Sequence, residues 1–194
     1  MASYIFQDLL SKAPANIRNN VADARSWMQD NVTTVTTNKI LSGDRQRMAD
    51  SPTPGRMYMF SYDPKTKDKL PYYDRFPLIF PFDSAPGGFM GLNLHYLPPL
   101  ARAKLMDGLW PLIDDDSLSP GSKLNISYKT LKRASRLRYF KPCVKRYLNN
   151  HVQSRFVTVY PEEWNIAVFL PTERFAKASK ASVYADSIGS TKWQ

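Results

Sequence analysis

A run of basic residues is the feature of this sequence with the clearest chemical meaning. Between Asp116 and Glu162 there is no acidic residue, whereas the same interval holds ten basic ones. The chain has a formal net charge of +10, and the remaining 17 basic and 17 acidic residues cancel, so the whole excess lies in this interval. Such asymmetry predicts an anionic partner. The candidate contact residues are Lys129, Lys132, Arg133, Arg136, Arg138, Lys141, Lys145 and Arg146.

The spacing within this run predicts how the charges are presented. On a helix over residues 127–137, four basic residues at i, i+3, i+4 and i+7 share one face, while Leu131 and Ala134 point toward a core. The four are Lys129, Lys132, Arg133 and Arg136. Pro142 predicts the start of a second helix, with Val144 and Leu148 on one side. These two helices are the elements expected to position the charges.

Three interpretations of this surface remain open from the sequence. It could neutralise phosphates of a nucleic acid, which gives salt-dependent binding with little sequence preference, and Tyr139 and Phe140 could add stacking. It could instead complement an acidic protein surface, or it could be a solvated face without a partner.

Residue types that support catalysis or metal binding are scarce. A pairing of Cys143 with His151 as nucleophile and base lacks any oxyanion-hole signature, and one cysteine with two histidines does not make a structural zinc site. His95 lies in an apolar stretch, which favours a core or interface histidine. The acidic run 114–116 is expected to be a solvated loop. We therefore expect no enzyme activity, no metal and no cofactor.

The aromatic stretch Met57–Leu97 is the expected scaffold. Its composition favours half-buried strands over helices. The predicted strands cover residues 57–62, 76–82 and 89–97, with a turn at Gly87-Gly88. Pro77 and Pro81 indicate that the second of them is an edge strand or a bent strand. The predicted fold class is α+β: a small curled antiparallel sheet or SH3-like partial barrel, with flanking helices and extended terminal arms.

The segments around this scaffold divide the chain into three predicted parts. Residues 1–50 form a helical arm and linker, 51–176 the α+β core, and 177–194 a polar tail. Helices are expected over 4–31, with a break near Pro14, and over 100–109, whereas residues 41–56 are expected to be an exposed linker. Residues 155–159 and 165–170 are predicted strands around a turn at Pro161, and Thr172 is predicted to cap a last short helix.

The sequence also restricts where the protein is expected to be found. No apolar run approaches the roughly 18–20 residues needed to cross a bilayer, so no membrane span is expected. The N-terminus has no basic region ahead of a long apolar segment, which argues against a secretory signal. A single cysteine excludes an internal disulfide and is compatible with a reducing compartment.

A family resemblance rests on overall pattern in three segments. These are GRMYMFSYDPKTKDKLPYYDRFPLIFPF from residue 55, GFMGLNLHYLPPLARAKLMDGL from residue 88, and YFKPCVKRYL from residue 139. Together they resemble a minor virion protein of large contractile-tailed bacteriophages, over most of residues 54–175. Proteins of this kind belong to the tail, baseplate or neck, or protect packaged DNA ends. The resemblance assigns no role to any single residue.

Two functions follow as expectations. The main one is a non-enzymatic structural subunit of the phage tail, baseplate or neck that docks on other virion proteins through its arms and basic face. The alternative is a DNA-binding protein that protects or holds packaged DNA ends. Either implies a protein made in the host cytoplasm and carried in the virion, in multiple copies within a larger assembly, and the basic residues contact either the DNA backbone or an acidic protein.

Overall fold

The computed structural model describes residues 5–18, 20–32, 35–42, 45–109 and 129–191. Within them, antiparallel strands form a six-stranded sheet in the order β1-β7-β2-β4-β5-β6. These strands are β1 (Met48–Ala49), β2 (Met57–Met59), β4 (Leu78–Ala85), β5 (Gly88–Asn93), β6 (Val144–Leu148) and β7 (Phe156–Val159). A second sheet pairs β3 (Tyr73–Asp74) with β8 (Phe175–Ala176). The predicted α+β class with an antiparallel sheet is confirmed, and the described strands form no closed barrel.

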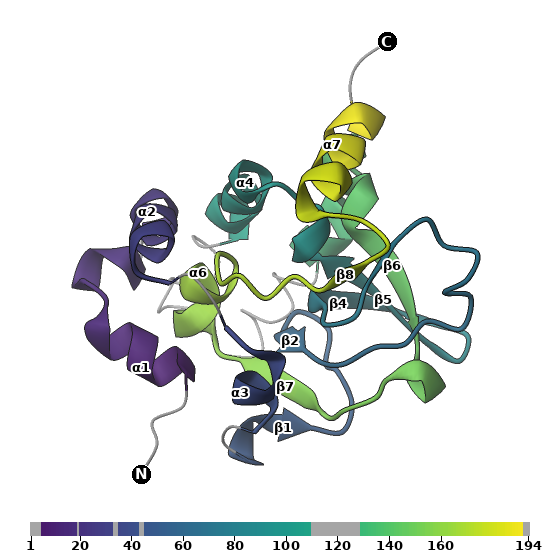
Figure 1. Cartoon of the computed structure of the whole chain (residues 1–194), viewed down its shortest axis with the longest axis horizontal. Coiled ribbons are helices and arrows are strands. Elements are labelled where there is room, and N and C mark those ends of the chain that lie inside the picture. Colours follow the sequence, from purple (N-terminus) through teal and green to yellow (C-terminus); the bar gives the residue numbers. More distant parts are fainter. Residues whose placement is uncertain (1–4, 19, 33–34, 43–44, 110–128, 192–194) are drawn as a thin grey trace.

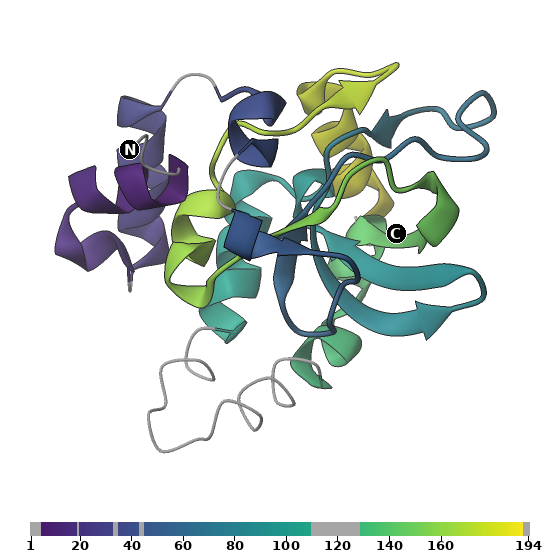
Figure 2. The ribbon, with the colours of Figure 1, turned by 90° about the horizontal axis from the view of Figure 1, so that it is seen from below.

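Helices lie around this sheet (Figures 1 and 2). The α-helices are α1 (Ile5–Lys12), α2 (Val21–Asn31), α3 (Thr37–Leu41), α4 (Pro99–Leu109), α6 (Trp164–Ala167) and α7 (Lys180–Thr191). The 3-10 helices are η1 (Ala15–Arg18), η2 (Arg45–Arg47), η3 (Leu94–Tyr96), η5 (Arg138–Cys143), η6 (Asn149–His151) and η7 (Pro161–Glu163). Two predictions are thereby confirmed: the broken helix over 4–31, and the helix over 100–109.

Each face of the sheet packs against its own hydrophobic cluster. Successive side chains along a strand point to opposite faces, so one strand contributes to both clusters. In β4, Leu78 and Phe80 join the main core with the helices. Ile79 between them points to a smaller aromatic core built from Tyr58, Phe60, Tyr62, Phe89, Tyr147 and Phe156. The ring centroids of Phe60 and Phe156 lie 4.8 Å apart there. The aromatic stretch thus supplies the interior, as expected.

The β4–β5 hairpin depends on two adjacent glycines. Gly87 has φ +71°, a conformation that residues with a Cβ rarely adopt, and it follows Pro86 in the turn between Ala85 and Gly88. A Cβ on Gly88 would lie 1.8 Å from the carbonyl oxygen of Tyr147 on β6. The predicted turn at Gly87-Gly88 is confirmed, and its second glycine also lets β6 approach.

Several local predictions are wrong. Strand β4 lies between β2 and β5, so the edge alternative for the proline-containing strand is wrong. The register of β4 shifts between Pro81 and Asp83, which accommodates a residue without an N–H. Residues 165–170 belong to α6 and the turn after it. The segment after Pro142 forms β6, which pairs with β5. Thr172 caps no helix, and the last helix is α7.

The terminal segments pack on the body and do not extend from it as arms. Ile5, Phe6 and Leu9 of α1 and Met28 of α2 lie in the main core, because these helices have apolar faces that must be covered. At the other end, Val183 of α7 is fully buried, and its neighbour Tyr184 donates its hydroxyl hydrogen to Glu173 at 3.0 Å. The division into residues 1–50, 51–176 and 177–194 stays a prediction.

The segment predicted to be an exposed linker contains a buried ion pair. The guanidinium of Arg47 donates two hydrogen bonds of 2.6 Å to the carboxylate of Glu163, and both side chains are 2% exposed. Arg47 also lies 4.5 Å from the ring centroid of Tyr160 and 5.9 Å from that of Phe6. This contact joins η2 to η7 and α1, so the prediction of an exposed linker is wrong for residues 47–49.

We predict that Arg47→Ala lowers the free energy of unfolding by about 3–5 kcal/mol, because Glu163 would remain charged and buried without its partner. The exposed pair of Arg155 and Asp50 is the matched control, and Arg155→Ala is expected to cost about 1 kcal/mol or less. Urea unfolding measures both values. Equal losses in the two variants would contradict the role given to the buried pair.

Candidate nucleic-acid interface

The predicted basic residues lie along one continuous stretch of the fold. Residues 129–134 are helical, a turn follows, and η5 then leads directly into β6. The helix therefore ends at residue 134 and not at the predicted 137, so Arg136 follows its end; its predicted start lies outside the described residues. Two of the predicted contact residues, Lys132 and Lys145, are half-buried. The exposed ones are Lys129, Arg133, Arg136, Arg138, Lys141 and Arg146.

The opposite side of this stretch is anchored in the main core. Leu131 and Cys143 are fully buried, and Ala134 is 5% exposed. The prediction that Leu131 and Ala134 point to a core is confirmed. Because the apolar side is fixed, the charged side is presented from a defined position on the body.

The basic side chains differ in whether they have partners within the protein. Lys132 forms an ion pair of 2.9 Å with Asp83, and its hydrogen bond lowers the pKa of that carboxyl group. Arg146 donates a hydrogen bond of 2.5 Å to the carbonyl oxygen of Pro86. In the described part of the chain no ion pair is found for Lys129, Arg133, Arg136 and Lys141. These four residues present their charges outward.

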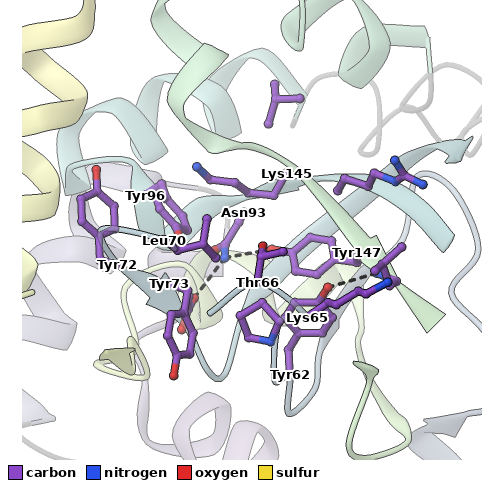
Figure 3. A pocket seen from close by; sticks show the side chains of 15 residues that line it. Tyr62, Lys65, Thr66, Leu70, Tyr72, Tyr73, Asn93, Tyr96, Lys145 and Tyr147 are labelled. Atoms are coloured by element: carbon purple, nitrogen blue, oxygen red, sulfur yellow. Dashed lines mark hydrogen bonds between the residues drawn. The ribbon is translucent and has the colours of Figure 1, made fainter. Parts of the chain in front are cut away.

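A pocket of about 550 Å³ lies beside this stretch, where the loop from Tyr62 to Tyr73 faces η3 and β6 (Figure 3). Tyr72, Tyr73 and Tyr96 line it together with Lys145 and Tyr147. Some of the lining rings contact one another: Tyr62 and Tyr147 have centroids 4.9 Å apart, and Tyr72 and Tyr96 6.0 Å apart. The pocket is therefore lined largely by tyrosine rings, with cations at its margin.

Lys145 is one of three cations that line this pocket, with Lys65 and Arg146. Its Nζ lies 3.9 Å from the centroid of the Tyr96 ring, in cation–π geometry. Burial lowers the pKa of Lys145 by disfavouring its charged form. No carboxylate forms an ion pair with it among the residues that the structure describes. An anion in the pocket would therefore meet a cation that no described carboxylate neutralises.

The buried carboxylate of Asp74 connects several of the segments that form the pocket. It accepts hydrogen bonds from His95 Nδ1 at 2.7 Å, Asn93 Nδ2 at 3.1 Å, and the backbone N–H groups of Phe76 and Arg174 at 3.0 and 3.3 Å. Asn93 also donates to the hydroxyl oxygen of Tyr147 at 3.1 Å. Burial alone would raise the pKa of Asp74, but His95 and these hydrogen bonds lower it below its usual value.

Neither the Cys143–His151 pair nor His95 lies in an environment that would support catalysis. Cys143 is buried, its Sγ lies 2.9 Å from the carbonyl oxygen of Phe140, and burial raises the pKa of the thiol to about 12. His151 donates its Nδ1 hydrogen to the carbonyl oxygen of Asp63 at 2.8 Å. His95 is fully buried between Asp74 and Thr172, which confirms the predicted core histidine.

Metal clusters and membrane-spanning helices were considered for the described residues. Groups of three or more potential metal ligands are absent from the described residues, and the acidic run 114–116 lies outside them. Among the helices that the structure describes, none is long and apolar enough to cross a membrane.

The sequence did not point to the pocket. Its walls come from three separated regions, residues 62–74, 93–96 and 144–148. Because β6 was predicted as a helix, the alternation that places Lys145 and Tyr147 on the same side of a strand was missed.

Comparison with known proteins identifies a matching family. The sequence profile of the family described as Phage T4 terminal DNA protecting protein matches residues 7–189. No curated protein and no solved structure is significantly similar to the chain. The matched span runs from α1 to α7 and includes the whole basic stretch and the pocket.

We predict that Asp74→Asn lowers the free energy of unfolding at pH 7 by about 3 kcal/mol, since an amide cannot accept from all of these donors. The folded pKa of Asp74 is lowered, so its stabilising contribution is full above the unfolded value of about 3.9 and is lost as pH falls below it. The difference between the two proteins should therefore shrink at low pH in urea unfolding. A difference that stays constant with pH would contradict this role.

Proposed function

Because the chain belongs to the Phage T4 terminal DNA protecting protein family, we propose that it binds the free ends of duplex DNA and protects them by covering them. One observation from the structure carries this proposal: the outward-facing cations Lys129, Arg133, Arg136 and Lys141, which together with Arg138 we call the basic face. The family match favours the alternative expectation of DNA-end protection over a tail, baseplate or neck subunit.

The basic face suits a DNA backbone because it offers several cations in a row to successive phosphates. Its residues lie on a short helix, a turn and η5 in succession, so they form a continuous stretch of charge. Lysine and arginine that neutralise phosphates release counterions, which gives affinity that falls steeply with salt and depends little on sequence. A protein that protects any end of its genome needs this kind of recognition.

We propose that protection requires no catalysis by the protein. The thiol of Cys143 is buried and its pKa is raised to about 12, so it is protonated at neutral pH. The imidazole of His95 is enclosed by Asp74 and Thr172 and has no exposed surface. A bound protein that denies a nuclease access to the strand terminus is sufficient to explain protection.

The setting that this function implies is the phage particle. We propose that the protein is made in the host cytoplasm, enters the virion with the packaged DNA and contacts other virion proteins there, in multiple copies. Four large apolar side chains are exposed among the described residues and suit such contacts: Leu100, Leu137, Tyr139 and Ile188. Co-sedimentation with filled heads supports the proposal; co-sedimentation with tails alone would favour the structural subunit.

We predict that reversing charge on the basic face, in the variant K129E/R133E/R136E, greatly weakens binding to linear duplex DNA. The slope of log K against log salt should become shallower by about 0.9 for each phosphate that the variant no longer neutralises. The matched control is K39E/R45E/R56E, which makes the same change in net charge at exposed residues far away in the sequence. Fluorescence anisotropy over a series of salt concentrations measures both affinity and slope.

Equal weakening in the two triple variants would mean that only net charge matters and would contradict the assignment of the basic face. Unchanged binding in K129E/R133E/R136E would contradict it outright. Thermal unfolding of each variant checks that the fold is retained.

A further inference from the structure

Binding of DNA ends by charge alone gives no role to the pocket beside the basic face. A cation–phosphate surface binds any part of a duplex, whereas protection of an end calls for something that distinguishes the terminus. The pocket is about 550 Å³, within the roughly 300–1,000 Å³ of small-ligand sites. It also includes Lys145 and Arg146, which continue the basic stretch into β6.

The charge of the pocket selects an anion. The acidic residues near it are engaged: Asp74 accepts from four donors, and Asp63 pairs with Lys67 at 2.9 Å. Asp186 is hydrogen-bonded to the hydroxyl group of Tyr72. The cations at its margin are Lys65, Lys145 and Arg146. Lys145 is largely removed from water and lies against the face of Tyr96, so an anionic group would restore the stabilisation that burial removes.

The walls of the pocket select a flat ring. Tyr72 and Tyr73 are half-buried and line the cavity. Tyr96 is 5% exposed, and Lys145 lies over one face of its ring. Figure 3 shows their rings on one side of the cavity and that of Tyr147 on another. Stacking on aromatic side chains is the usual way in which proteins hold unpaired bases without sequence preference.

A flat ring joined to an anion describes a nucleotide. We propose that this pocket receives the 5′-phosphorylated terminal nucleotide of a DNA strand, with its base against the tyrosine rings and its phosphate at Lys145. This inference rests on the proposed end-binding function and adds the group that is recognised. A terminal phosphate monoester carries more negative charge than an internal diester, which suits a pocket margin that holds Lys65, Lys145 and Arg146.

The test compares two DNA probes and two variants. One probe is a duplex with an open end that carries a short 5′-phosphorylated overhang; the other is the same duplex with that end closed by a hairpin loop. The variant is Lys145→Gln, and the matched control is Lys141→Gln, which removes the same charge from an exposed position on the basic face. Anisotropy gives the ratio of affinities for open and closed ends.

We expect the unaltered protein to prefer the open end, and Lys145→Gln to reduce this preference about tenfold while affinity for the closed probe stays the same. Lys141→Gln should weaken binding to both probes equally. Removal of the 5′-phosphate from the open probe should have the effect of Lys145→Gln. An unaltered protein without end preference, or equal effects of the two variants, overturns the pocket assignment.

Failure of the proposed function is a separate result: K129E/R133E/R136E would then bind the closed probe as tightly as the unaltered protein does. The unaltered protein also allows a direct measurement that does not depend on the folding of a variant. Mass spectrometry of lysine acetylation should show Lys145 protected by a 5′-phosphorylated dinucleotide and not by a hexaglutamate peptide. Equal protection by the peptide would assign the pocket to an acidic protein segment and overturn the nucleotide.

Discussion

The buried carboxylate of Asp74 is the interaction on which the arrangement of this protein depends. Its donors come from β5, η3 and the segment before β8, so a single charge ties residues 74, 93, 95 and 174 together. The network continues from His95 to Thr172 and from Asn93 to Tyr147. Arg102 extends it by donating to the carbonyl oxygen of His95 and to the carboxylate of Glu173. Asp74, Asn93 and Tyr147 belong both to this network and to the lining of the pocket. The hydrogen bonds of the network therefore fix the geometry of the pocket.

Two groups of cations in this chain have different roles. Arg47 and Arg102 are buried, make ion pairs of 2.6 Å with Glu163 and Glu173, and hold terminal segments onto the body. The outward cations lie on the basic face, where acidic neighbours are absent from the sequence. Buried pairs position parts of the chain, and outward surface charges remain available to a polyanion.

Local sequence patterns predicted the features that depend on near neighbours. The aromatic core, the turn at Gly87-Gly88 and the inward Leu131 and Ala134 follow from composition, conformational freedom and periodicity. Features that depend on distant partners were missed. Arg47 meets Glu163 116 residues away, Pro81 is tolerated inside the sheet because the register shifts beside it, and the pocket joins three regions. The apolar run over 165–170 fits a strand or a helix, and its packing against α1 and α2 selects the helix.

Protection of DNA ends can be measured by nuclease digestion. A linear duplex with saturating protein is treated in parallel with an exonuclease and with an endonuclease that cuts at an internal site. We expect exonuclease digestion to slow strongly while internal cleavage proceeds at its normal rate. Equal slowing of both reactions would show that the protein merely coats DNA, and no slowing of the exonuclease would contradict end protection.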